Sequence, residues 1–464
     1  MIVDAARAAL ATGPLCDPCL GRLVADRSFG LTNDERGLAL RTAVALADDD
    51  PFEAGSPAEC WVCEGECSRY DTWADRAAEA LADVDFSTYQ VGTRAPPLIE
   101  ENDALLRLEA GLSEDAGEPF KSECNREVGK RLGRSTGAEV DFERPDVLCL
   151  LGIERETVEV QVNPAFLYGR YRKLERDVPQ TEWPCSACGA TGKELAPDGG
   201  EQACTECGGS GYRYDDSVEG LTAPVVRETM DGSEGVFHGA GREDVDARAL
   251  GTGRPFVIEV KHPRVRDVDP AEAEATINDS TALVEVEGLR RATHDMVERV
   301  KQLDASKTYA MTVRFAEPVS ETELDDACEA LVGETVEQRT PRRVDHRRTD
   351  LVRTREVYAA DGTLDTDTVE SAGDGGGDGG GDIESESTGN DIETARGERE
   401  GRRATIEVHG AGGLYVKELV HGDDGRTDPS LAGLLGVDIE VEALDVLAVE
   451  GENEPFEKPE YFLD

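Results

Sequence analysis

Hydrophobic and polar residues follow two different periods along this chain, and the periods divide it into helices and strands. Between residues 20 and 49, apolar residues recur as they do on one face of a helix. From about residue 75 to 180, helical stretches mix with short strand-like runs bounded by turn residues, namely 73–84, 86–92, 120–133, 146–153 and 156–164. Beyond about residue 216, strands and helices alternate at 254–263, 292–305, 307–316 and 321–333. This mixture predicts an α+β protein.

The same patterns divide the chain into four predicted parts. They are an N-terminal module (1–75), an α+β domain (76–182), a compact insertion (183–215) and a larger C-terminal domain (216–464). Residues 360–400 of the last part are rich in Gly, Asp, Glu and Ser with almost no apolar residues, so they cannot bury a core. We expect a disordered acidic loop there. Its glycine run lacks the Lys-Ser/Thr of a phosphate-binding loop.

The charge of the chain is extreme, with 99 acidic and 49 basic residues and a formal net charge of −50. Nucleic-acid binding relies on Lys and Arg, so this charge argues at first against such a partner. The acid is spread along the whole chain, however, which is typical of proteins adapted to very high salt, and net charge then reports solubility. The chain has no run of about 18 apolar residues and no N-terminal signal pattern. We therefore expect a cytoplasmic protein, monomeric and without a membrane partner.

Twelve cysteines in a cytoplasmic chain indicate metal binding rather than disulfides. Eight of them form four C-x-x-C pairs, and two such pairs complete a tetrahedral zinc site. The first predicted site, in the N-terminal module, comprises Cys16, Cys19, Cys60 and Cys63, although Cys67 could replace one ligand. The second, in a hairpin insertion, comprises Cys185, Cys188, Cys204 and Cys207. Both would be structural zinc sites; the alternative is a reduced or redox-active pair without metal.

Two segments depart from the acidic background. Residues 338–358 carry seven arginines against three acids: Arg339, Arg342, Arg343, Arg347, Arg348, Arg353 and Arg355. Arginine makes planar, bidentate phosphate contacts, so this segment predicts a strip that binds a polyanion. The alternative is an exposed strand whose arginines pair with local carboxylates. A second basic island, residues 168–177, holds Arg170 and Arg172 around Tyr171, whose ring could stack on a base.

The stretch FHGAGREDVDARALGTGRPF, residues 237–256, sets carboxylates beside arginines: Arg242, Glu243, Asp244, Asp246 and Arg248. An ordinary solvated loop is one interpretation of it. The other is an active site in which arginines hold one carboxylate ionised and glycines let the backbone approach a ligand closely.

The segment GREDVDARALGTGRPF resembles the active-site segment of archaeal-type tRNA pseudouridine synthases of the tenth class, which modify positions 54 and 55 in the TΨC arm. Further segments in the expected order are similar to the same family: KSECNREVGK, NPAFLYGRYRKLERDVPQTEWPC, EQRTPRRVDHRRTDLVR and GGLYVKELVHGDDGRTDPS. The resemblance covers most of residues 120–440, and the N-terminal C-x-x-C pairs agree with it. The chain departs from the family in its acidic loop, its overall acidity and the presence of Cys124, where a larger apolar side chain is expected.

The resemblance implies a zinc module and a THUMP-type RNA-binding domain, followed by a catalytic domain with the mixed, mainly antiparallel sheet of pseudouridine synthases. It also implies tRNA as the partner, no cofactor and no catalytic metal. The family's nucleophilic aspartate follows Arg-x, which corresponds to Asp244 here. Lys417 resembles the basic residue that pairs with this aspartate, and such a neighbour would keep Asp244 ionised.

The remaining site residues are expected to hold the substrate. Tyr309 would be the aromatic platform under the uracil and take part in proton transfer from C5; the alternative is a core tyrosine on a strand. Arg242 would hold a phosphate or fill the gap left by an extruded nucleotide, and Tyr415 joins the substrate-binding set. The reaction breaks the N-glycosidic bond and rejoins uracil through C5, which needs a nucleophilic carboxylate. Whether Asp244 attacks C1′ of the ribose or C6 of the base stays open.

Three other functions compete with pseudouridine synthesis. A non-catalytic tRNA-binding or chaperone protein would need the basic strip but not the chemistry of Asp244. A THUMP-bearing methyltransferase would need a Gly-rich turn between strand and helix for its cofactor, and a thiolase would need a phosphate loop with a reactive cysteine. The sequence contains neither of these last two features, so it favours the synthase.

Overall fold

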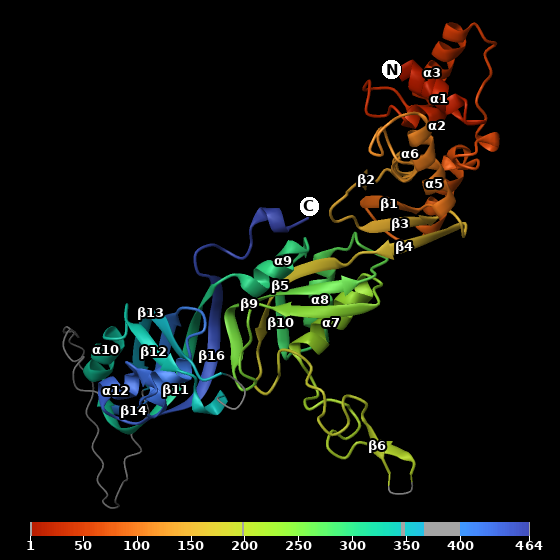
Figure 1. Ribbon diagram of the computed structural model, residues 1–464. Coiled ribbons are helices and arrows are strands. Elements are labelled where there is room, and N and C mark those ends of the chain that lie inside the picture. The colour runs from red at the N-terminus through yellow and green to blue at the C-terminus, as the bar shows by residue number, and fades with distance from the viewer. Residues whose placement is uncertain (1, 197–198, 345–348, 366–399, 464) are drawn as a thin grey trace, which may run out of the picture. The chain divides into compact units, whose positions relative to one another are not determined.

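The computed structural model describes residues 2–196, 199–344, 349–365 and 400–463, and the chain forms two compact units (Figure 1). Unit 1 comprises Met1–Ala165, Arg227–Glu234 and Val260–Val268. Unit 2 comprises Phe166–Val226, Gly235–Glu259 and Asp269–Asp464. Each unit has its own hydrophobic core.

Short helices surround a cluster of cysteines in the N-terminal part of unit 1. They are α1 (Ile2–Leu10), α2 (Asp17–Arg22), α3 (Asn33–Asp48), the 3-10 turns η1 (Pro57–Glu59) and η2 (Glu66–Ser68), and α4 (Tyr70–Ala80). The helical period between residues 20 and 49 thus corresponds to the end of α2 and to α3. A capping box starts α3, because the Glu35 amide donates to the Thr32 hydroxyl at 3.2 Å and the Glu35 carboxylate accepts from the Thr32 amide at 2.7 Å.

The rest of unit 1 is a small α+β domain. Its strands β1 (Thr88–Arg94), β2 (Glu139–Val140), β3 (Val147–Gly152) and β4 (Thr157–Val162) form a sheet of order β2-β1-β3-β4. Strand β1 runs parallel to β2 and β3, and β4 is antiparallel to β3. Two helices, α5 (Pro97–Glu109) and α6 (Phe120–Thr136), complete it. The apolar face of α6 is buried in the same core as Val147 and Leu151 of β3.

A large sheet forms the body of unit 2, and it places strands from distant parts of the sequence side by side, such as green β9 and blue β16 (Figure 1). The strand order is β10-β5-β9-β16-β11-β14-β13-β12-β15, with β8 paired to β9. The strands are β5 (Ala165–Lys173), β8 (Glu234–Gly239), β9 (Arg248–Lys261), β10 (Val284–Ala292), β11 (Ala305–Ser320), β12 (Thr335–Arg339), β13 (Val352–Leu364), β14 (Glu400–Gly410), β15 (Thr427–Asp428) and β16 (Ile439–Gly451). Strands β9 and β16 pair in parallel, whereas β11 is antiparallel to both β14 and β16. The predicted mixed, mainly antiparallel sheet is confirmed.

Helices of unit 2 pack against this sheet. They are α7 (Val218–Thr229), α8 (Pro270–Ser280), α9 (Asp295–Gln302), α10 (Glu321–Glu329), α11 (Val416–His421) and α12 (Leu431–Leu435), and the 3-10 turns are η3 (Arg342–Val344), η4 (Gly422–Gly425) and η5 (Pro459–Tyr461). Along β11, Met311, Val313 and Phe315 are fully buried at every second position, as expected for a strand with one face in the core. The strand that carries Tyr309 therefore packs one face against the core of unit 2.

The predicted insertion at 183–215 forms a two-stranded hairpin within unit 2. Its strands, β6 (Lys193–Leu195) and β7 (Glu201–Ala203), pair antiparallel. The chain enters and leaves at one place, because the Arg213 amide donates to the Trp183 carbonyl at 2.9 Å. The hairpin brings its two C-x-x-C turns together.

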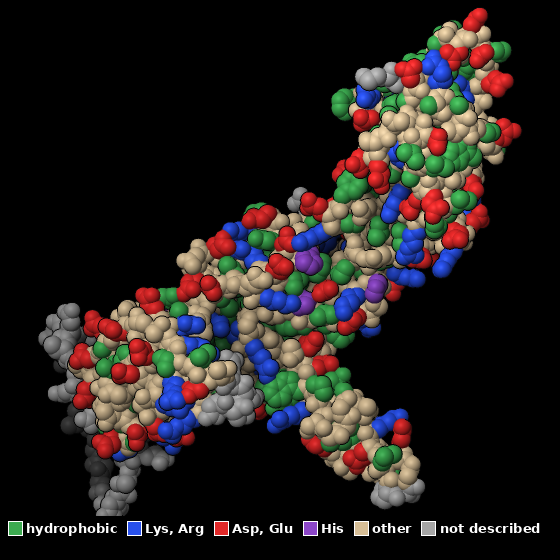
Figure 2. Space-filling model, in the orientation of Figure 1, with side chains coloured by type: hydrophobic (Ala, Val, Ile, Leu, Met, Phe, Trp, Pro, Cys, Tyr) green, Lys and Arg blue, Asp and Glu red, His purple; other side chains and the backbone are tan. Residues whose placement is uncertain are grey.

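The predicted start of the acidic loop, residue 360, lies within a strand. Strand β13 continues to Leu364, whose backbone pairs with Ala404 of β14, so the strand ladder overrides the polar composition of residues 360–364. The remainder of that prediction, residues 366–399, lies outside the described residues. Acidic side chains cover the visible face of both units widely (Figure 2). Among the described residues, no helix is long and apolar enough to cross a membrane.

Candidate active site and metal centres

The carboxylate loop, residues 240–247, connects β8 to β9 and places its three acidic side chains in three environments. The Glu243 side chain is fully buried, whereas Asp244 is 42% exposed and Asp246 is 64% exposed. Gly241 begins the loop with a φ of +70°, in the left-handed region that favours glycine. A buried carboxylate cannot meet a substrate, so Asp244 and Asp246 are the two side chains of this loop that could act on one.

Glu243 anchors the carboxylate loop from inside the unit. Its carboxylate accepts a hydrogen bond from the Tyr171 hydroxyl at 2.9 Å and lies 2.8 Å from Nε of Arg254 and 3.9 Å from Nζ of Lys173. Arg254 also donates to the Ala240 carbonyl at 2.8 Å, which ties down the start of the loop. Burial, followed by the charge of Glu243, raises the pKa of Tyr171 well above its usual range, so this phenol remains a donor. These contacts fix the backbone that presents Asp244.

Two cations reach Asp244. Lys417, in the first turn of α11, has its Nζ 3.5 Å from Oδ2 of Asp244 and 3.0 Å from Oδ2 of Asp246. Arg343, in η3, has Nη1 3.1 Å from Oδ2 of Asp244, and its Nε donates to the buried Glu418 carboxylate at 2.7 Å. Burial tends to raise the pKa of Asp246, but the Lys417 hydrogen bond and the charges of Lys417 and Arg343 act together with a backbone hydrogen bond to lower that pKa overall. Asp244 is thus an accessible carboxylate held between a lysine and an arginine.

Strand β11 contributes Tyr309 and Lys307, which project from the same face of the strand two residues apart. The Tyr309 side chain is only 9% exposed. Burial raises the pKa of Tyr309 to about 12; Arg254 opposes this shift and the negative charge of Asp244 adds to it. Tyr309 is therefore a neutral phenol within the electrostatic reach of Asp244. Burial also lowers the pKa of Lys307 to about 8, and the Arg254 guanidinium acts in the same direction.

Two glycines of the segment 237–256 allow neighbouring backbone to approach strand β9 closely. Gly251 has a φ of +55°, and a Cβ there would lie 2.1 Å from the Leu447 carbonyl of the adjacent strand β16. At Gly253, with a φ of +70°, a Cβ would lie 2.9 Å from the Tyr171 carbonyl. At both positions the close approach is to the protein's own backbone, which corrects the interpretation that these glycines make room for a ligand.

Arg242 is exposed and stacks on an aromatic ring at the base of the hairpin. Its Cζ lies 4.9 Å from the centroid of Trp183, and Arg213 lies 5.7 Å from the same ring. This contact holds Arg242 beside the carboxylate loop. Its predicted roles, phosphate binding or filling the gap of a flipped nucleotide, stay predictions.

The basic island on β5 is not a free RNA-binding surface. Tyr171 is fully buried, so the prediction that its ring stacks on a base is wrong. Alternation along the strand explains this, since Tyr171 faces the core while its neighbours face outward. Arg170 pairs with Glu450 at 2.8 Å, and Arg172 pairs with Glu285 at 3.0 Å. To bind tRNA, both arginines would have to release these carboxylates and pair with phosphate groups instead.

The arginines of the predicted strip have different surroundings. Arg343 turns toward Asp244, whereas Arg339 and Arg342 pair with the exposed carboxylates of Asp350 and Asp424. Arg353 lies 5.9 Å from the ring of Tyr415, which is half-buried. Exposed pairs of this kind contribute little and exchange readily. The predicted substrate contacts of Arg339, Arg342, Arg353 and Tyr415 stay predictions. Those of Arg347 and Arg348 lie outside the described residues.

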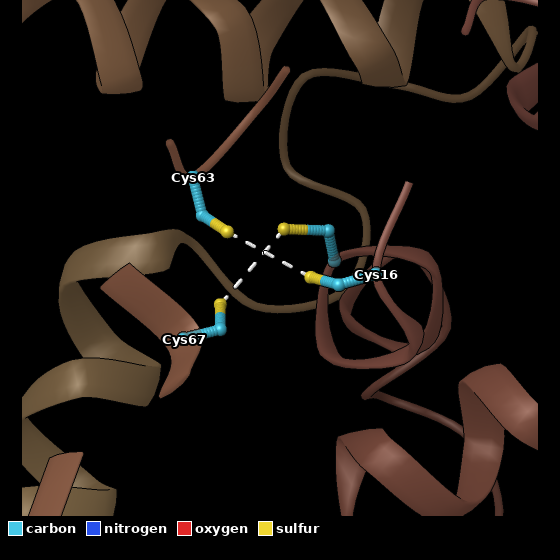
Figure 3. A group of neighbouring side chains, drawn as sticks. Cys16, Cys63 and Cys67 are labelled. Carbon is cyan, nitrogen blue, oxygen red and sulfur yellow. Dashed lines mark hydrogen bonds between the residues drawn. The ribbon is translucent and has the colours of Figure 1, made fainter. Parts of the chain in front are cut away.

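The first cysteine cluster lies in unit 1, and its sulfur atoms face a common centre (Figure 3). Its members are Cys16, Cys19, Cys63 and Cys67, all buried, with sulfur atoms within 4.8 Å of one another. The Cys16–Cys63 and Cys19–Cys67 sulfur separations are 3.7 and 3.9 Å. A tetrahedral zinc with Zn–S bonds of about 2.3 Å requires about 3.8 Å, so the residues fit the metal.

Cys67 replaces Cys60 in this quartet, which corrects the predicted ligand set. The 3-10 turn η2 carries Cys67, and the Glu66 amide donates to the Cys63 carbonyl at 2.9 Å just before it. This tight turn brings Cys67 back to the centre. A C-x-x-C spacing could not reveal it, because Cys67 follows Cys63 by four residues.

The second cluster is the one predicted, with Cys185, Cys188, Cys204 and Cys207 within 4.8 Å of one another. The Cys185–Cys204 and Cys188–Cys207 sulfur separations are 3.9 and 3.8 Å. The Gly211 amide donates to the Cys207 sulfur at 3.2 Å, as backbone amides do around bound thiolates. This quartet also fits a tetrahedral metal.

Sequence reasoning missed three features of the site: the contact of Arg343 with Asp244, the support of Arg343 by Glu418, and the anchoring role of Glu243. The sequence gives one signal for the second of these. Lys417 and Glu418 are the two charged residues inside the otherwise apolar pattern of LYVKELV, and a buried carboxylate requires a cation. The identity of that cation depends on the fold.

The chain is similar to curated proteins over its whole length. A protein of Halorubrum lacusprofundi named tRNA pseudouridine synthase Pus10 is 57% identical over 464 residues, covering 100% of both chains. A protein of the same name from Methanothrix thermoacetophila is 40% identical, covering 97% of this chain and 95% of its own. The chain belongs to the Pus10 family of pseudouridine synthases. The predicted family and enzyme class are confirmed. The prediction of an archaeal, halophilic protein is supported by the Halorubrum relative.

Two Pus10 family models match the chain in separate regions. The Pus10 C-terminal model matches residues 166–370 and 390–450, and the archaeal Pus10 THUMP model matches residues 73–152. The second range contains strands β1 to β3 and helices α5 and α6, so the predicted THUMP domain is confirmed. The solved structure of a Cbf5-Nop10-Gar1 complex overlaps 50% of this chain and 45% of its own at 16% identity, with a TM-score of 0.27. That TM-score is too low to argue a shared fold.

Proposed function

We propose that this chain converts uridine to pseudouridine in the TΨC arm of tRNA, at positions 54 and 55, with Asp244 as the nucleophile. The name of its Pus10 relatives, tRNA pseudouridine synthase, supports the substrate. One observation carries the assignment of the nucleophile. Among the three carboxylates of the loop, Asp244 combines solvent access, two cationic neighbours and the electrostatic influence on Tyr309.

The environment of Asp244 suits a carboxylate that must stay ionised and keep one orientation. Lys417 and Arg343 both approach its Oδ2, and the buried Glu418 holds the Arg343 guanidinium in place. Such an ionised carboxylate can attack either C1′ of the ribose or C6 of the base, and both routes release uracil for rotation. Tyr309 would support the flipped base with its ring, and its phenol oxygen would take the proton from C5 as the phenol's own proton leaves to solvent.

Asp246 and Glu243 are less suited to this role. Asp246 is more exposed than Asp244. It pairs with Lys417 at 3.0 Å, whereas Asp244 pairs with both Lys417 and Arg343. Glu243 is enclosed by Arg254 and Tyr171 inside the unit. We therefore assign Asp246 to sharing Lys417 with Asp244, and Glu243 to holding the loop.

The proposed enzyme works as a cytoplasmic monomer and needs no cofactor for its chemistry. Zinc would have a structural role in both cysteine quartets, because closed four-thiolate sites contribute folding energy. The THUMP domain and the exposed arginines of the strip would bind the tRNA backbone, and Arg242 would contact the RNA next to the flipped uridine.

Mapping of pseudouridine on a defined tRNA tests this function. Purified protein is incubated with an unmodified tRNA transcript at the high salt that its composition suggests, and carbodiimide adducts are mapped by reverse transcription. We expect stops at positions 54 and 55, and loss of each stop in a transcript with cytidine at that position. Tight tRNA binding without any stop would instead support the non-catalytic alternative.

A further inference from the structure

Arg22, the last residue of α2, lies between the first cysteine quartet and the THUMP helices. Its side chain is 0% exposed, although arginine is rarely fully buried without compensating charges. Nothing in its sequence context distinguishes it from an exposed residue at the end of a helix. The contacts that compensate its buried charge therefore need to be identified.

One side of the Arg22 guanidinium faces the thiols. Its Nη1 lies 3.4 Å from the Cys19 sulfur and 3.5 Å from the Cys67 sulfur. The Tyr70 hydroxyl donates to the same Cys67 sulfur at 3.3 Å. A zinc ion with four thiolate ligands carries surplus negative charge, and a buried cation with donors aimed at two sulfurs neutralises part of it.

The other side of Arg22 faces the two THUMP helices. Nη2 donates to Asp103 of α5 at 2.8 Å, and Nη1 donates to Glu123 of α6 at 2.9 Å. The Asp103 carboxylate also accepts from the Phe120 amide at 3.2 Å, at the first residue of α6, and the Arg22 Cζ lies 5.4 Å from the Phe120 ring. One side chain thus joins the metal ligands to the middle of α5 and to the first turn of α6.

We propose that Arg22 is the positioning residue that couples the metal centre to the fold of the THUMP domain. Zinc bound by the quartet holds Arg22, and Arg22 in turn holds Asp103 and Glu123, so that loading the metal stabilises α5 and α6. The inference rests on the zinc role proposed above. It extends that role from a local staple of the N-terminal module to the RNA-binding domain.

The second quartet provides an internal control. In the described part of the chain, its sulfurs receive a hydrogen bond from the Gly211 amide, and no arginine or lysine nitrogen donates to them. Any effect of an Arg22 substitution on zinc should therefore be confined to the first site. A full-length Cys188→Ser, Cys207→Ser background leaves only that site to be measured.

The test compares wild type, Arg22→Met and Arg22→Lys in this background. Two quantities are measured: the rate of zinc transfer to a chromogenic chelator, and hydrogen exchange of peptides from α5 and α6 before and after metal removal. Partners outside the ligand sphere typically change metal affinity by about 10–100-fold. We expect Arg22→Met to release zinc about 10–100-fold faster, and Arg22→Lys to lie between. Metal removal from wild type should strip protection from α5 and α6.

Two results would overturn the coupling: zinc release from Arg22→Met at the wild-type rate, or full protection of α5 and α6 after metal removal. If Arg22→Met does not fold, Glu123→Gln is tested in its place. Glu123→Gln should lower the hydrogen-exchange protection of α6 and leave the contacts of Arg22 with the cysteine sulfurs intact. A background protein that holds no zinc would refute the metal proposal itself. In protein with both zinc sites intact, Arg22→Met should not change the rate at which the second site releases zinc to the chelator.

Discussion

Arg343 offers the sharpest contrast between the sequence and the structure, because the strip interpretation assigns it to tRNA phosphate and the structure places it on Asp244. The substitution Arg343→Met removes the guanidinium and keeps much of the apolar length of the side chain. We expect it to slow the chemical step at saturating tRNA. Arg342→Met is the matched control, since Arg342 pairs with the exposed Asp424 and not with the carboxylate loop.

The size of the effect follows from the geometry. Nη1 of Arg343 lies 3.1 Å from Oδ2 of Asp244, and at an effective dielectric constant of about 20 unit charges at this distance attract by about 5 kcal/mol. The two side chains are 40% and 42% exposed, so solvent reduces this to about 0.2–1 kcal/mol. If the transition state loses that much stabilisation, the rate falls by up to about fivefold.

The assay is single-turnover pseudouridine formation, with tRNA affinity measured in parallel over a range of salt concentrations. Arg343→Met also leaves the Glu418 carboxylate buried and unpaired, which costs about 1–3 kcal/mol of stability. Adding Glu418→Gln should restore the melting temperature while the rate stays low, which separates folding from chemistry. An unchanged rate, with affinity lost equally in Arg343→Met and Arg342→Met, would refute the pairing and return Arg343 to the phosphate strip.

Three further predictions concern other parts of the chain. Tyr309→Phe should keep tRNA affinity and slow single-turnover product formation, whereas Tyr309→Ala should nearly abolish it; equal rates for Phe and wild type would remove the phenol from the chemistry. Cys67→Ser should lower zinc content from two equivalents toward one by elemental analysis, and Cys60→Ser should not; the reverse result would restore the predicted ligand set. Lys307 has a folded-state pKa of about 8 against 10.5 for an unperturbed lysine, so the unfolded state binds more protons between these values and stability rises with pH there. Urea denaturation should show this rise in wild type and a flatter profile in Lys307→Met.

The sequence-based predictions agree with the structure where the signal was local. The strands and helices of the THUMP domain follow from hydrophobic period, and the second cysteine quartet follows from spacing within a hairpin. Asp244 and Lys417, assigned through resemblance, lie 3.5 Å apart. Each of these predictions depends on residues that are close in sequence or on a motif that fixes their relation.

Other predictions failed because they depended on which way a side chain points. Tyr171 sits in a basic segment, yet strand alternation directs it into the core, where it bonds Glu243. Arginine density at 338–358 indicated charge but not direction, and Arg343 faces a carboxylate from a distant segment. Cys67 displaces Cys60 because a 3-10 turn closes on the centre. Tertiary packing decides such cases, and composition does not report it.

The most direct test of the account is the activity of Asp244→Asn on unmodified tRNA, with Asp246→Asn as the matched control. Single-turnover carbodiimide mapping at saturating tRNA should show no pseudouridine for Asp244→Asn, while its tRNA affinity stays within a few-fold of wild type. Asp246→Asn should retain most of the activity. Residual turnover of Asp244→Asn above roughly a hundredth of wild type would contradict the assignment, because loss of a true nucleophile costs far more than that.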